Sequence, residues 1–555
     1  MISMIPAKLT FLISNIVICL LLTVISTVGI TRQLQMLQLN SYFASRYFGW
    51  LKQNKKYIAA NIFFILLSAL AAAFLRLRDW SLDLLFKFIE PNLSYALIFL
   101  IAGAALLVVL AVAAYIFAAR AVSKNRKSIK PLVVTARIKR TYATSAIVSL
   151  VLSAVCVLFE GFPGFAAFFL LCLLTFAPCL NVLLCLFLNT PIEKAIANHY
   201  VRDAKKILKA NKNLTVLGIT GSFGKTSTKF IVKRILDEAF NVVATPGSFN
   251  TPMGVVRTVR SDLSPVSDIF LCEMGAKKRG DIKEICDIAK PQIAIITSVG
   301  PQHLDTFGSI EAVADTKFEL ADAADEVFLN FDNEIIRSRA EKYNYTSYGT
   351  TEDCDVYAKD ISYGSFGAAF TVVCDGDELH IVTKLLGRHN VLNITAGVAV
   401  AKRLGIKNSA IEYAASRLTP TEHRLEMKSF INGSLLIDDA YNANPEGCLE
   451  AVNVLSSFQN KKKIIVTPGL VELGADEYKY NYQLGLAAAK KCDIIILVGE
   501  ERAVPMLDAA RAHSFPEENL HVVRSFAEAM AILNTVADKD CVTLFENDLP
   551  DNYLR

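Results

Sequence analysis

The residues with the clearest chemical potential lie in the run Gly218-Ile-Thr-Gly-Ser-Phe-Gly-Lys-Thr226. An apolar stretch typical of a strand precedes the run, and residues 227–240, which are typical of a helix, follow it. A glycine-rich turn between a strand and a helix exposes backbone N–H groups that bind anions. In such a loop Lys225 reaches the β- and γ-phosphates of a nucleotide, and the Thr226 hydroxyl binds Mg²⁺. The sequence therefore predicts a site for ATP or GTP.

The loop departs from the general phosphate-binding pattern at one position, because Ile219 stands where the first glycine is expected. The plain alternative is a glycine turn that only caps a helix, and the Gly-Lys-Thr order in a strand–turn–helix setting disfavours it. The departure indicates a variant loop that belongs to a particular family. The predicted nucleotide-binding residues of the loop are Gly221, Ser222, Gly224, Lys225, Thr226 and Ser227.

Further segments follow the loop in a fixed order, and together they carry a family resemblance. They are Asn250-Thr-Pro-Met-Gly254, Glu273-Met-Gly275, Gly280-Asp-Ile282, Gly-Pro-Gln-His303, Asp-Thr-Lys317, Gly387-Arg-His-Asn390 with Asn393, His423-Arg424 and Asp438-Asp-Ala-Tyr-Asn-Ala-Asn-Pro445. Over residues 214–555 the chain resembles the Mur ligases, the ATP-dependent amide ligases of peptidoglycan precursor synthesis. The last segment is most similar to the members that add D-alanyl-D-alanine to a muramoyl-tripeptide.

The resemblance implies a ligase that activates a carboxylate with ATP as an acyl phosphate, which an amine then attacks. The expected cofactors are ATP and two Mg²⁺ ions. Thr226 and Glu273 are the expected ligands of one ion, since a carboxylate after the apolar run 269–272 suits an oxygen-seeking cation. The alternative for Glu273 is a solvated strand end. The resemblance assigns the second ion to His303 and to Lys317, which is carbamylated in the family.

The resemblance also implies residues around the nucleotide and the transferred phosphoryl group. Asn390 and Asn393 are expected to lie on the side of the site that binds the nucleotide, and Asp439 is expected to contact the ribose. Arg424 is expected at the γ-phosphate or acyl phosphate, where a planar cation suits spread negative charge. His423 stands just before it, where the family often has glycine. The predicted catalytic residues are Lys225, His303, Lys317 and Arg424.

The first 190 residues differ in composition from the rest of the 555-residue chain. Apolar residues make up 53% of the chain and its mean hydropathy is +0.37, too high for an ordinary soluble enzyme. A helix that spans a bilayer needs about 20 mostly apolar residues. The sequence predicts about five such helices, over residues 9–30, 57–74, 95–117, 145–159 and 165–188. A re-entrant hairpin is the alternative for the last two, because 145–159 is short.

Lysine and arginine are concentrated in the loops after the first and third predicted spans, and the loop after the second has few. The positive-inside rule then places the N-terminus outside and the C-terminus inside. We therefore expect a multi-pass protein of the bacterial cell membrane with cytoplasmic catalytic domains, on the side where ATP is available. The net charge of +5 is explained by these loops, so it does not indicate nucleic-acid binding.

After a predicted transmembrane domain over residues 1–190, residues 191–213 are predicted to form a linker helix. Residues 214–420 are predicted as the central ATP-binding domain and residues 421–555 as the C-terminal domain. Strand-type and helix-type runs alternate in both, which indicates α/β domains. The expected fold class is an N-terminal α-helical transmembrane domain followed by two α/β domains. In the family the C-terminal domain is Rossmann-like and closes over the nucleotide.

The family usually begins with a domain that binds the UDP-sugar, and predicted membrane spans stand there in this sequence. The expected partners are therefore the lipid bilayer, a muramoyl-peptide or other carboxylate acceptor, an amino acid or dipeptide, and a cell-wall synthesis complex. Two other classes stay open: a membrane ATPase or transport protein, and a non-catalytic scaffold with a relic ligase domain. The nearly charge-free spans disfavour an ion path, and the intact phosphate and metal residues disfavour a relic.

Overall fold

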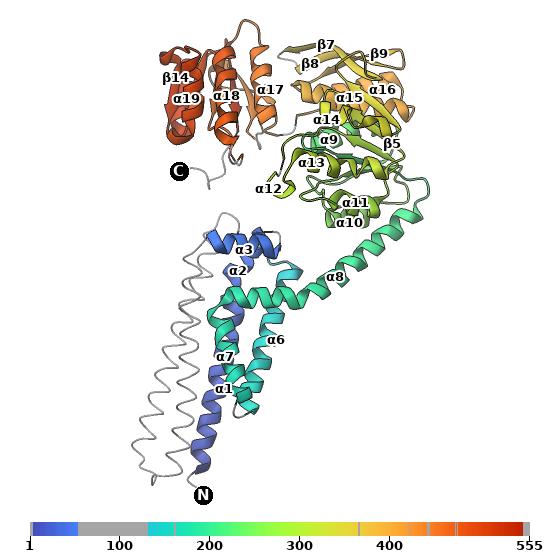
Figure 1. Ribbon diagram of the computed structural model, residues 1–555. Coiled ribbons are helices and arrows are strands. Elements are labelled where there is room, and N and C mark those ends of the chain that lie inside the picture. The colour runs from blue at the N-terminus through green and yellow to red at the C-terminus, as the bar shows by residue number, and fades with distance from the viewer. Residues whose placement is uncertain are drawn as a thin grey trace. The chain divides into compact units, whose positions relative to one another are not determined.

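The computed structural model describes residues 4–40, 42–53, 131–159, 162–302, 304–364, 367–420, 422–440, 445–471, 473 and 476–547 (Figure 1). The chain divides into two compact units, Met1–His199 and Tyr200–Arg555. The predicted spans 57–74 and 95–117 and the candidate ligand His303 lie outside the described residues.

The described part of the first unit is helical. Its helices are α1 (Met4–Gly29), α2 (Thr31–Leu39), α3 (Ala44–Gln53), α6 (Ala136–Leu158), α7 (Phe162–Phe176) and α8 (Pro178–Ala210). Three segments, Asn15–Leu39, Ala136–Leu158 and Pro178–Ala210, are long and apolar enough to cross a membrane. At 23 residues, α6 is longer than the predicted span 145–159, so the length argument for a re-entrant hairpin no longer applies to it.

Hydroxyl and amide side chains join α1 to its neighbours in this unit. The Thr23 and Ser153 hydroxyls lie 2.9 Å apart, and the Ser149 hydroxyl donates to that of Ser26 at 3.1 Å. Asn181 of α8 also donates to the Ser26 hydroxyl, at 2.8 Å. All five side chains are buried. We call these five residues the polar seam. Because its members are buried and bonded to one another, the seam holds the helices in register.

Two helix boundaries predicted in this unit are wrong. The predicted span 165–188 is divided between α7 and α8 at Ala177. Pro178 has no N–H with which to continue α7, and it disfavours a helical conformation in the residue before it. In the other direction, α8 continues through Pro191, so the predicted linker helix is the C-terminal part of α8. The predicted end of the membrane domain therefore falls inside a helix.

The central domain is built on a nine-stranded sheet in the order β2-β3-β1-β4-β5-β6-β7-β8-β9. Its strands are β1 (Thr215–Thr220), β2 (Val242–Ala244), β3 (Ile269–Glu273), β4 (Ile293–Ile296), β5 (Glu326–Asn330), β6 (Tyr345–Gly349), β7 (Val356–Gly364), β8 (Gly367–Cys374) and β9 (Asp377–Thr383). Neighbours from β2 to β7 pair in parallel, and β8 and β9 extend the sheet in antiparallel. β3 and β4 are buried along their whole length, as expected for parallel strands covered on both faces.

Helices cover both faces of this sheet. They are α9 (Lys225–Leu236), α10 (Pro252–Ser261), α11 (Asp281–Ala289), α12 (Leu304–Phe307), α13 (Ile310–Phe318), α14 (Glu334–Arg337), α15 (Arg388–Arg403) and α16 (Asn408–Ser416). Leu217 of β1 packs in one core with α9, α15 and α16, and Val216 packs in another with α10, α11 and α13. This alternation of neighbouring side chains between two apolar cores fixes the register of β1.

The C-terminal domain holds a six-stranded sheet in the order β10-β11-β15-β12-β13-β14. Its strands are β10 (Glu426–Ser429), β11 (Leu435–Asp439), β12 (Lys462–Thr467), β13 (Ile494–Val498), β14 (Leu520–Val523) and β15 (Cys541–Glu546). Its helices are α17 (Pro445–Ser456), α18 (Glu477–Lys491), α19 (Glu500–Ala512) and α20 (Phe526–Val536). All neighbours pair in parallel except β10 with β11. The prediction of two α/β domains is confirmed.

The parallel register of the central sheet brings the chemistry-bearing residues to one edge. Ile219 of β1 lies beside Glu273 of β3, and Thr220 lies beside Ile296 of β4. The carboxyl ends of β1, β3 and β4 therefore meet at the same edge, the usual ligand-binding edge of such a sheet. The loop that leaves β1 there is the glycine-rich run identified from the sequence.

Candidate active site

The glycine-rich loop joins β1 directly to α9, as the sequence predicts. Gly224 is the N-cap of α9 and has a φ of +81°, a left-handed conformation that glycine adopts without strain. A Cβ atom on Gly221 would lie 2.0 Å from the Thr297 hydroxyl oxygen. Lys225, Thr226 and Ser227 form the first turn of α9. Gly221 therefore leaves no room for a side chain, and the loop passes directly into the first turn of α9.

The loop is anchored to the segment that follows β4. The Phe223 carbonyl accepts hydrogen bonds from the hydroxyls of Thr297, at 2.5 Å, and Ser298, at 3.1 Å. The Ser222 hydroxyl donates to the Gly300 carbonyl at 3.1 Å and accepts from its N–H at the same distance. Two neighbouring strands therefore hold the loop in one conformation, as a phosphate cradle requires.

The Lys225 side chain folds back over the carbonyl groups of the glycine-rich loop. Its Nζ donates to the loop carbonyls of Gly221, at 2.6 Å, and Ser222, at 3.1 Å. Burial lowers the pKa of Lys225 to about 8; the negative charge of Glu273 opposes this shift, and the positive charge of Arg424 adds to it. An ammonium with a depressed pKa gains when anionic oxygens replace neutral carbonyls around it.

Thr226 and Glu273 form an oxygen pair next to the loop. The Thr226 hydroxyl donates to Oε1 of Glu273 at 3.1 Å, and the Glu273 side chain is fully buried. Glu273 is therefore not a solvated strand end, and the alternative suggested by the sequence is wrong. A hydroxyl and a carboxylate oxygen, both hard ligands, fit Mg²⁺ at this position. These two residues would hold the ion.

Lys317 is buried near Lys225, at the C-terminal end of α13. Burial, and to a smaller extent the charge of Lys225, lower the pKa of Lys317 to about 7 against the opposing effects of Glu319 and Asp281. Its side chain is only 1% exposed. A lysine with this pKa is about half neutral at pH 7, and a neutral amine can act as a nucleophile. The structure thus brings Lys317 into the site, although the sequence alone gives a lone lysine no role.

Asn390 and Asn393 project from the first turns of α15, and they have different surroundings. Asn393 Oδ1 accepts a hydrogen bond from the Thr228 hydroxyl of α9 at 2.8 Å, while its buried Nδ2 has no partner in the described part of the chain. Asn390 donates to the Leu386 carbonyl at 2.8 Å. A Cβ on Gly224 would lie 3.3 Å from Asn393 Oδ1, so Asn393 is the one directly beside the loop.

Arg424 enters the site from the start of the C-terminal domain. Its charge lowers the pKa of Asp439, whose net pKa is raised by burial to about 6, and it also acts on Lys225. Asp439 Oδ1 accepts the Leu425 N–H at 3.1 Å. His423, at the family's glycine position, has a φ of +59°, in the region that favours glycine. Its Nδ1 lies 2.8 Å from Asp438 Oδ2, which holds the strained turn.

Two buried charged residues were not singled out from the sequence. Lys229 lies one turn after Lys225 on α9, and its Nζ is 2.9 Å from Oε2 of Glu273. Glu546 ends β15 beside Asp439, where it accepts a hydrogen bond from the Cys448 thiol at 2.8 Å, and burial raises its pKa. The i, i+4 spacing of two lysines was a readable signal for Lys229, whereas Glu546 depends on pairing between distant strands.

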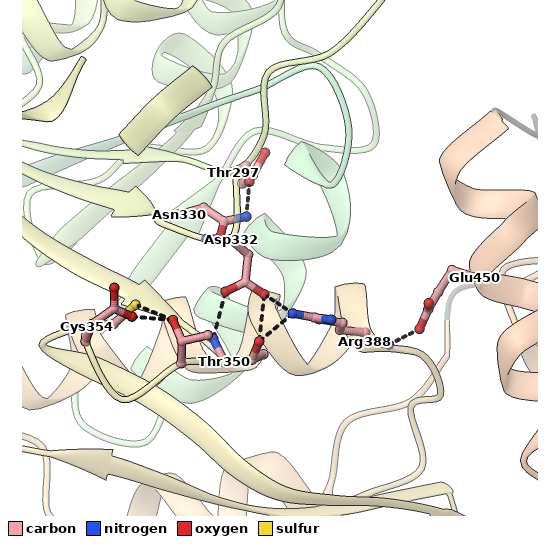
Figure 2. Close-up of polar contacts among 9 residues, drawn as sticks. Thr297, Asn330, Asp332, Thr350, Cys354, Arg388 and Glu450 are labelled. Carbon is pink, nitrogen blue, oxygen red and sulfur yellow. Dashed lines mark hydrogen bonds and ion pairs between the residues drawn. The ribbon is translucent and has the colours of Figure 1, made fainter. Parts of the chain in front are cut away.

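Figure 2 shows a second polar cluster, which joins the two α/β domains. Asp332, just after β5, accepts hydrogen bonds from the N–H and hydroxyl of Thr350, both at 2.8 Å. Arg388 donates to Asp332 Oδ2 at 2.9 Å and to the Thr350 hydroxyl at 2.6 Å. The Arg388 N–H donates to Glu450 of α17 at 2.6 Å. We call Asp332, Thr350, Arg388 and Glu450 the domain contact.

A chain of hydrogen bonds connects the domain contact to the phosphate loop. The Asp332 N–H donates to Asn330 Oδ1 at 3.0 Å, and Asn330 Nδ2 donates to the Thr297 carbonyl at 2.7 Å (Figure 2). Thr297 is the residue whose hydroxyl holds Phe223 of the loop. The loop and the C-terminal domain are therefore linked through consecutive polar contacts along the edge of the sheet.

These features define a class of protein: a nucleotide-binding α/β domain with a phosphate loop, followed by a second α/β domain. Residues 219–401 match the Mur ligase middle domain, and residues 423–545 match the Mur ligase, glutamate ligase domain. The two matches together cover more than half of the chain, which therefore contains both of these Mur ligase domains.

Among its relatives is the UDP-N-acetylmuramoyl-tripeptide--D-alanyl-D-alanine ligase of Bacillus subtilis (strain 168), 31% identical over 51% of this chain and 63% of the relative. The enzyme of the same name from Escherichia coli (strain K12) is 30% identical over 52% of this chain and 65% of its own length. The crystal structure of MurF ligase from Thermotoga maritima in complex with ADP gives a TM-score of 0.56 at 27% identity. The match to this structure covers 63% of this chain and 80% of the Thermotoga chain. For the Bacillus subtilis and Escherichia coli enzymes, the chain spans less than two thirds of the relative's length.

Proposed function

We propose that this protein is an ATP-dependent amide ligase of peptidoglycan precursor synthesis. The observation that carries the proposal is the anchored glycine-rich loop, with the Lys225 ammonium over its carbonyl groups and the Thr226–Glu273 oxygen pair beside it. The named activity of the similar ligases supports it. A relic scaffold would have no reason to keep these contacts, and a transport ATPase would not share these relatives.

In the proposed reaction, a carboxylate oxygen of the acceptor attacks the γ-phosphorus of ATP, and the bond to the bridging oxygen breaks to release ADP. The amine then attacks the acyl phosphate carbon, inorganic phosphate leaves, and the nitrogen loses a proton to give the amide. Lys225 and the loop N–H groups hold the phosphates, and Arg424 stabilises the charge on the transferred group. Thr226 and Glu273 would hold Mg²⁺, which would supply further positive charge to the phosphates.

Lys317 and His303 are proposed to serve a second Mg²⁺ ion. In this proposal the neutral Lys317 amine adds CO₂ and releases a proton, which replaces an ammonium by an anionic oxygen ligand. The depressed pKa of Lys317 supports the proposal, because only the neutral amine reacts with CO₂. The negative charge of a carbamate on Lys317 would attract a cation, whereas the positive charge of the Lys317 ammonium would repel one.

The remaining predicted residues are proposed to bind the nucleotide. The unpartnered amide of Asn393 beside the loop supports a contact to ATP, and Asn390 positions the turn that carries Asn393. Asp439 is proposed to contact the ribose from the C-terminal domain. Its carboxyl is held by the Leu425 N–H, one residue after Arg424, so the two proposed contacts share one turn.

The proposed substrates are a muramoyl-tripeptide as acceptor and D-alanyl-D-alanine as amine, by analogy with the similar ligases. We further propose that the acceptor is linked to a lipid and that the protein acts as a multi-pass protein of the bacterial cell membrane, with its catalytic domains in the cytoplasm. The three segments able to span a bilayer support this. An anchor in the same membrane raises the effective concentration of a lipid-linked acceptor.

Phosphate release from ATP by the full-length protein in detergent tests the ligase proposal. The acceptors are UDP-muramoyl-tripeptide and a lipid-linked muramoyl-tripeptide, each with and without D-alanyl-D-alanine. Lys225→Ala should abolish release that depends on both substrates. Lys233→Ala is the matched control, because Lys233 lies on the same helix and pairs with Asp237, away from the loop. Ligation at the wild-type rate by Lys225→Ala would remove the phosphate loop from the mechanism.

The membrane proposal is tested separately, with the full-length protein in nanodiscs. Turnover of the lipid-linked acceptor placed in the same nanodisc should exceed turnover of the soluble UDP-linked acceptor at equal total concentration. Equal turnover of both acceptors would leave an ordinary ligase whose helices only localise it.

A further inference from the structure

Lys229 is a buried lysine to which the proposed reaction gives no task. Its side chain is fully inaccessible to solvent, and so is that of its partner Glu273. Nζ of Lys229 lies 2.9 Å from Oε2 of Glu273 and also donates to the carbonyl of Gly247. A buried charge is stable only when it is paired and hydrogen-bonded. Each member of this pair therefore depends on the other.

The second oxygen of Glu273 has a different set of neighbours. Oε1 accepts hydrogen bonds from Asn250 Nδ2 at 3.0 Å and from the Thr226 hydroxyl at 3.1 Å. The Glu273 N–H donates to the Thr245 hydroxyl at 3.1 Å, which fixes the end of β3. Lys229 thus contacts Oε2 of Glu273, and Oε1 faces the Thr226 hydroxyl at the proposed metal site.

The electrostatic consequence concerns the proposed metal site when no nucleotide is bound. Lys229 cancels the single negative charge of Glu273, and Lys225 is a further cation nearby, because Glu273 acts on its pKa. A divalent cation therefore meets no net negative charge from these residues. The phosphates of ATP would supply that charge, so the ion gains strongly only when the nucleotide is present.

We propose that Lys229 is a positioning residue that makes metal binding depend on nucleotide binding. It orients Glu273 so that only Oε1 is offered, and it neutralises the carboxylate so that the metal alone binds weakly. This inference rests on the proposed function of Thr226 and Glu273 as metal ligands. It also explains why the segment from Gly247 to Asn250 closes around the carboxylate, since both ends of that segment bond to the pair.

The test measures Mn²⁺ binding by electron paramagnetic resonance, with and without ATP, on the full-length protein in detergent. The variants are Lys229→Met, which removes both charge and hydrogen bonds, and Lys229→Gln, which keeps an amide donor. Both should bind Mn²⁺ without nucleotide at least about tenfold more tightly than the wild type, because an uncompensated carboxylate attracts the ion. Lys233→Met, on the exposed side of the same helix, should bind as the wild type does.

The turnover of the variants completes the test. Lys229→Met should lower kcat at least about tenfold with little change in KM for ATP, since Glu273 is no longer oriented while the phosphate loop is intact. If Lys229→Met does not fold, Lys229→Gln decides the question. Unchanged nucleotide-free Mn²⁺ affinity in Lys229→Gln would overturn the inference. A wild type that binds neither Mn²⁺ nor ATP would instead overturn the proposed function, so the two failures are distinguishable.

Discussion

Glu273 and Asp332 each hold one basic side chain at the edge of the central sheet, and the two pairs differ in burial. The side chains of Lys229 and Glu273 are 0% and 1% exposed, whereas Arg388 and Asp332 are 55% and 9% exposed. When one member of a buried pair is removed, water cannot reach the remaining charge. When one member of a half-exposed pair is removed, water can solvate the other. The first pair therefore fixes geometry at the site, and the second provides an adjustable contact between domains.

The largest expected effect is that of Glu273→Ala, which leaves the Lys229 ammonium buried without a partner. We expect the free energy of unfolding to fall by about 3–5 kcal/mol. Urea denaturation followed by circular dichroism measures this change. Glu238→Ala is the control, because Glu238 pairs with Arg234 at the surface of α9 and should cost less than about 1 kcal/mol. A decrease in the free energy of unfolding no larger than that of Glu238→Ala would contradict the stated difference between the buried pair and the exposed pair.

A second prediction concerns Lys317, a buried lysine that forms no ion pair with a carboxylate among the described residues, unlike Lys229. Its pKa is lowered to about 7, so its neutral fraction rises from minor to dominant between pH 6 and pH 8. An ordinary lysine is neutral in only about one molecule in 2500 at pH 7. Carbon-13 NMR with labelled bicarbonate should show a carbamate signal that increases over this range and is absent in Lys317→Ala. A signal equally strong at pH 6 and pH 8 would contradict the assignment.

The smallest expected effect is that of Arg388→Ala in the domain contact. Its guanidinium is mostly exposed, so we expect a loss of at most about 1 kcal/mol, which shrinks further at high salt. Urea denaturation at two ionic strengths measures it. The hydrogen bond from the Arg388 N–H to Glu450 survives this substitution, so Glu450→Ala is the complementary variant. A loss as large as that of Glu273→Ala would show that the two pairs do not differ as their burial predicts.

The comparison also shows which parts of the site the sequence could predict. The phosphate loop and the position of Glu273 after a buried strand follow from local pattern, because the apolar run 269–272 and the glycine spacing are continuous in the chain. Lys229 was missed because a lysine on a helix usually indicates a solvated surface, although its i, i+4 spacing from Lys225 was readable. Arg388 and Asp332 are 56 residues apart, and no local pattern predicts their contact.

The same limit applies to the fold. The alternation of strand-type and helix-type runs predicted both α/β domains. The division between α7 and α8 was missed, although Pro178 was visible, because hydropathy averaged over 165–188 does not register one lost N–H. The continuation of α8 through Pro191 was missed for the opposite reason, since a proline kink does not always end a helix.

The polar seam has a consequence for the biogenesis of the proposed membrane unit. Thr23 and Ser153 are 130 residues apart, so at about 5–20 residues per second the ribosome needs roughly 6 to 26 seconds to reach the second after the first. During that interval α1 would lie in the bilayer without its partner helix. The Thr23 hydroxyl also donates to the Cys19 carbonyl of its own helix, at 2.9 Å. The Thr23 hydroxyl therefore has a hydrogen-bond acceptor within α1 before α6 is inserted, and it can pair with Ser153 afterwards.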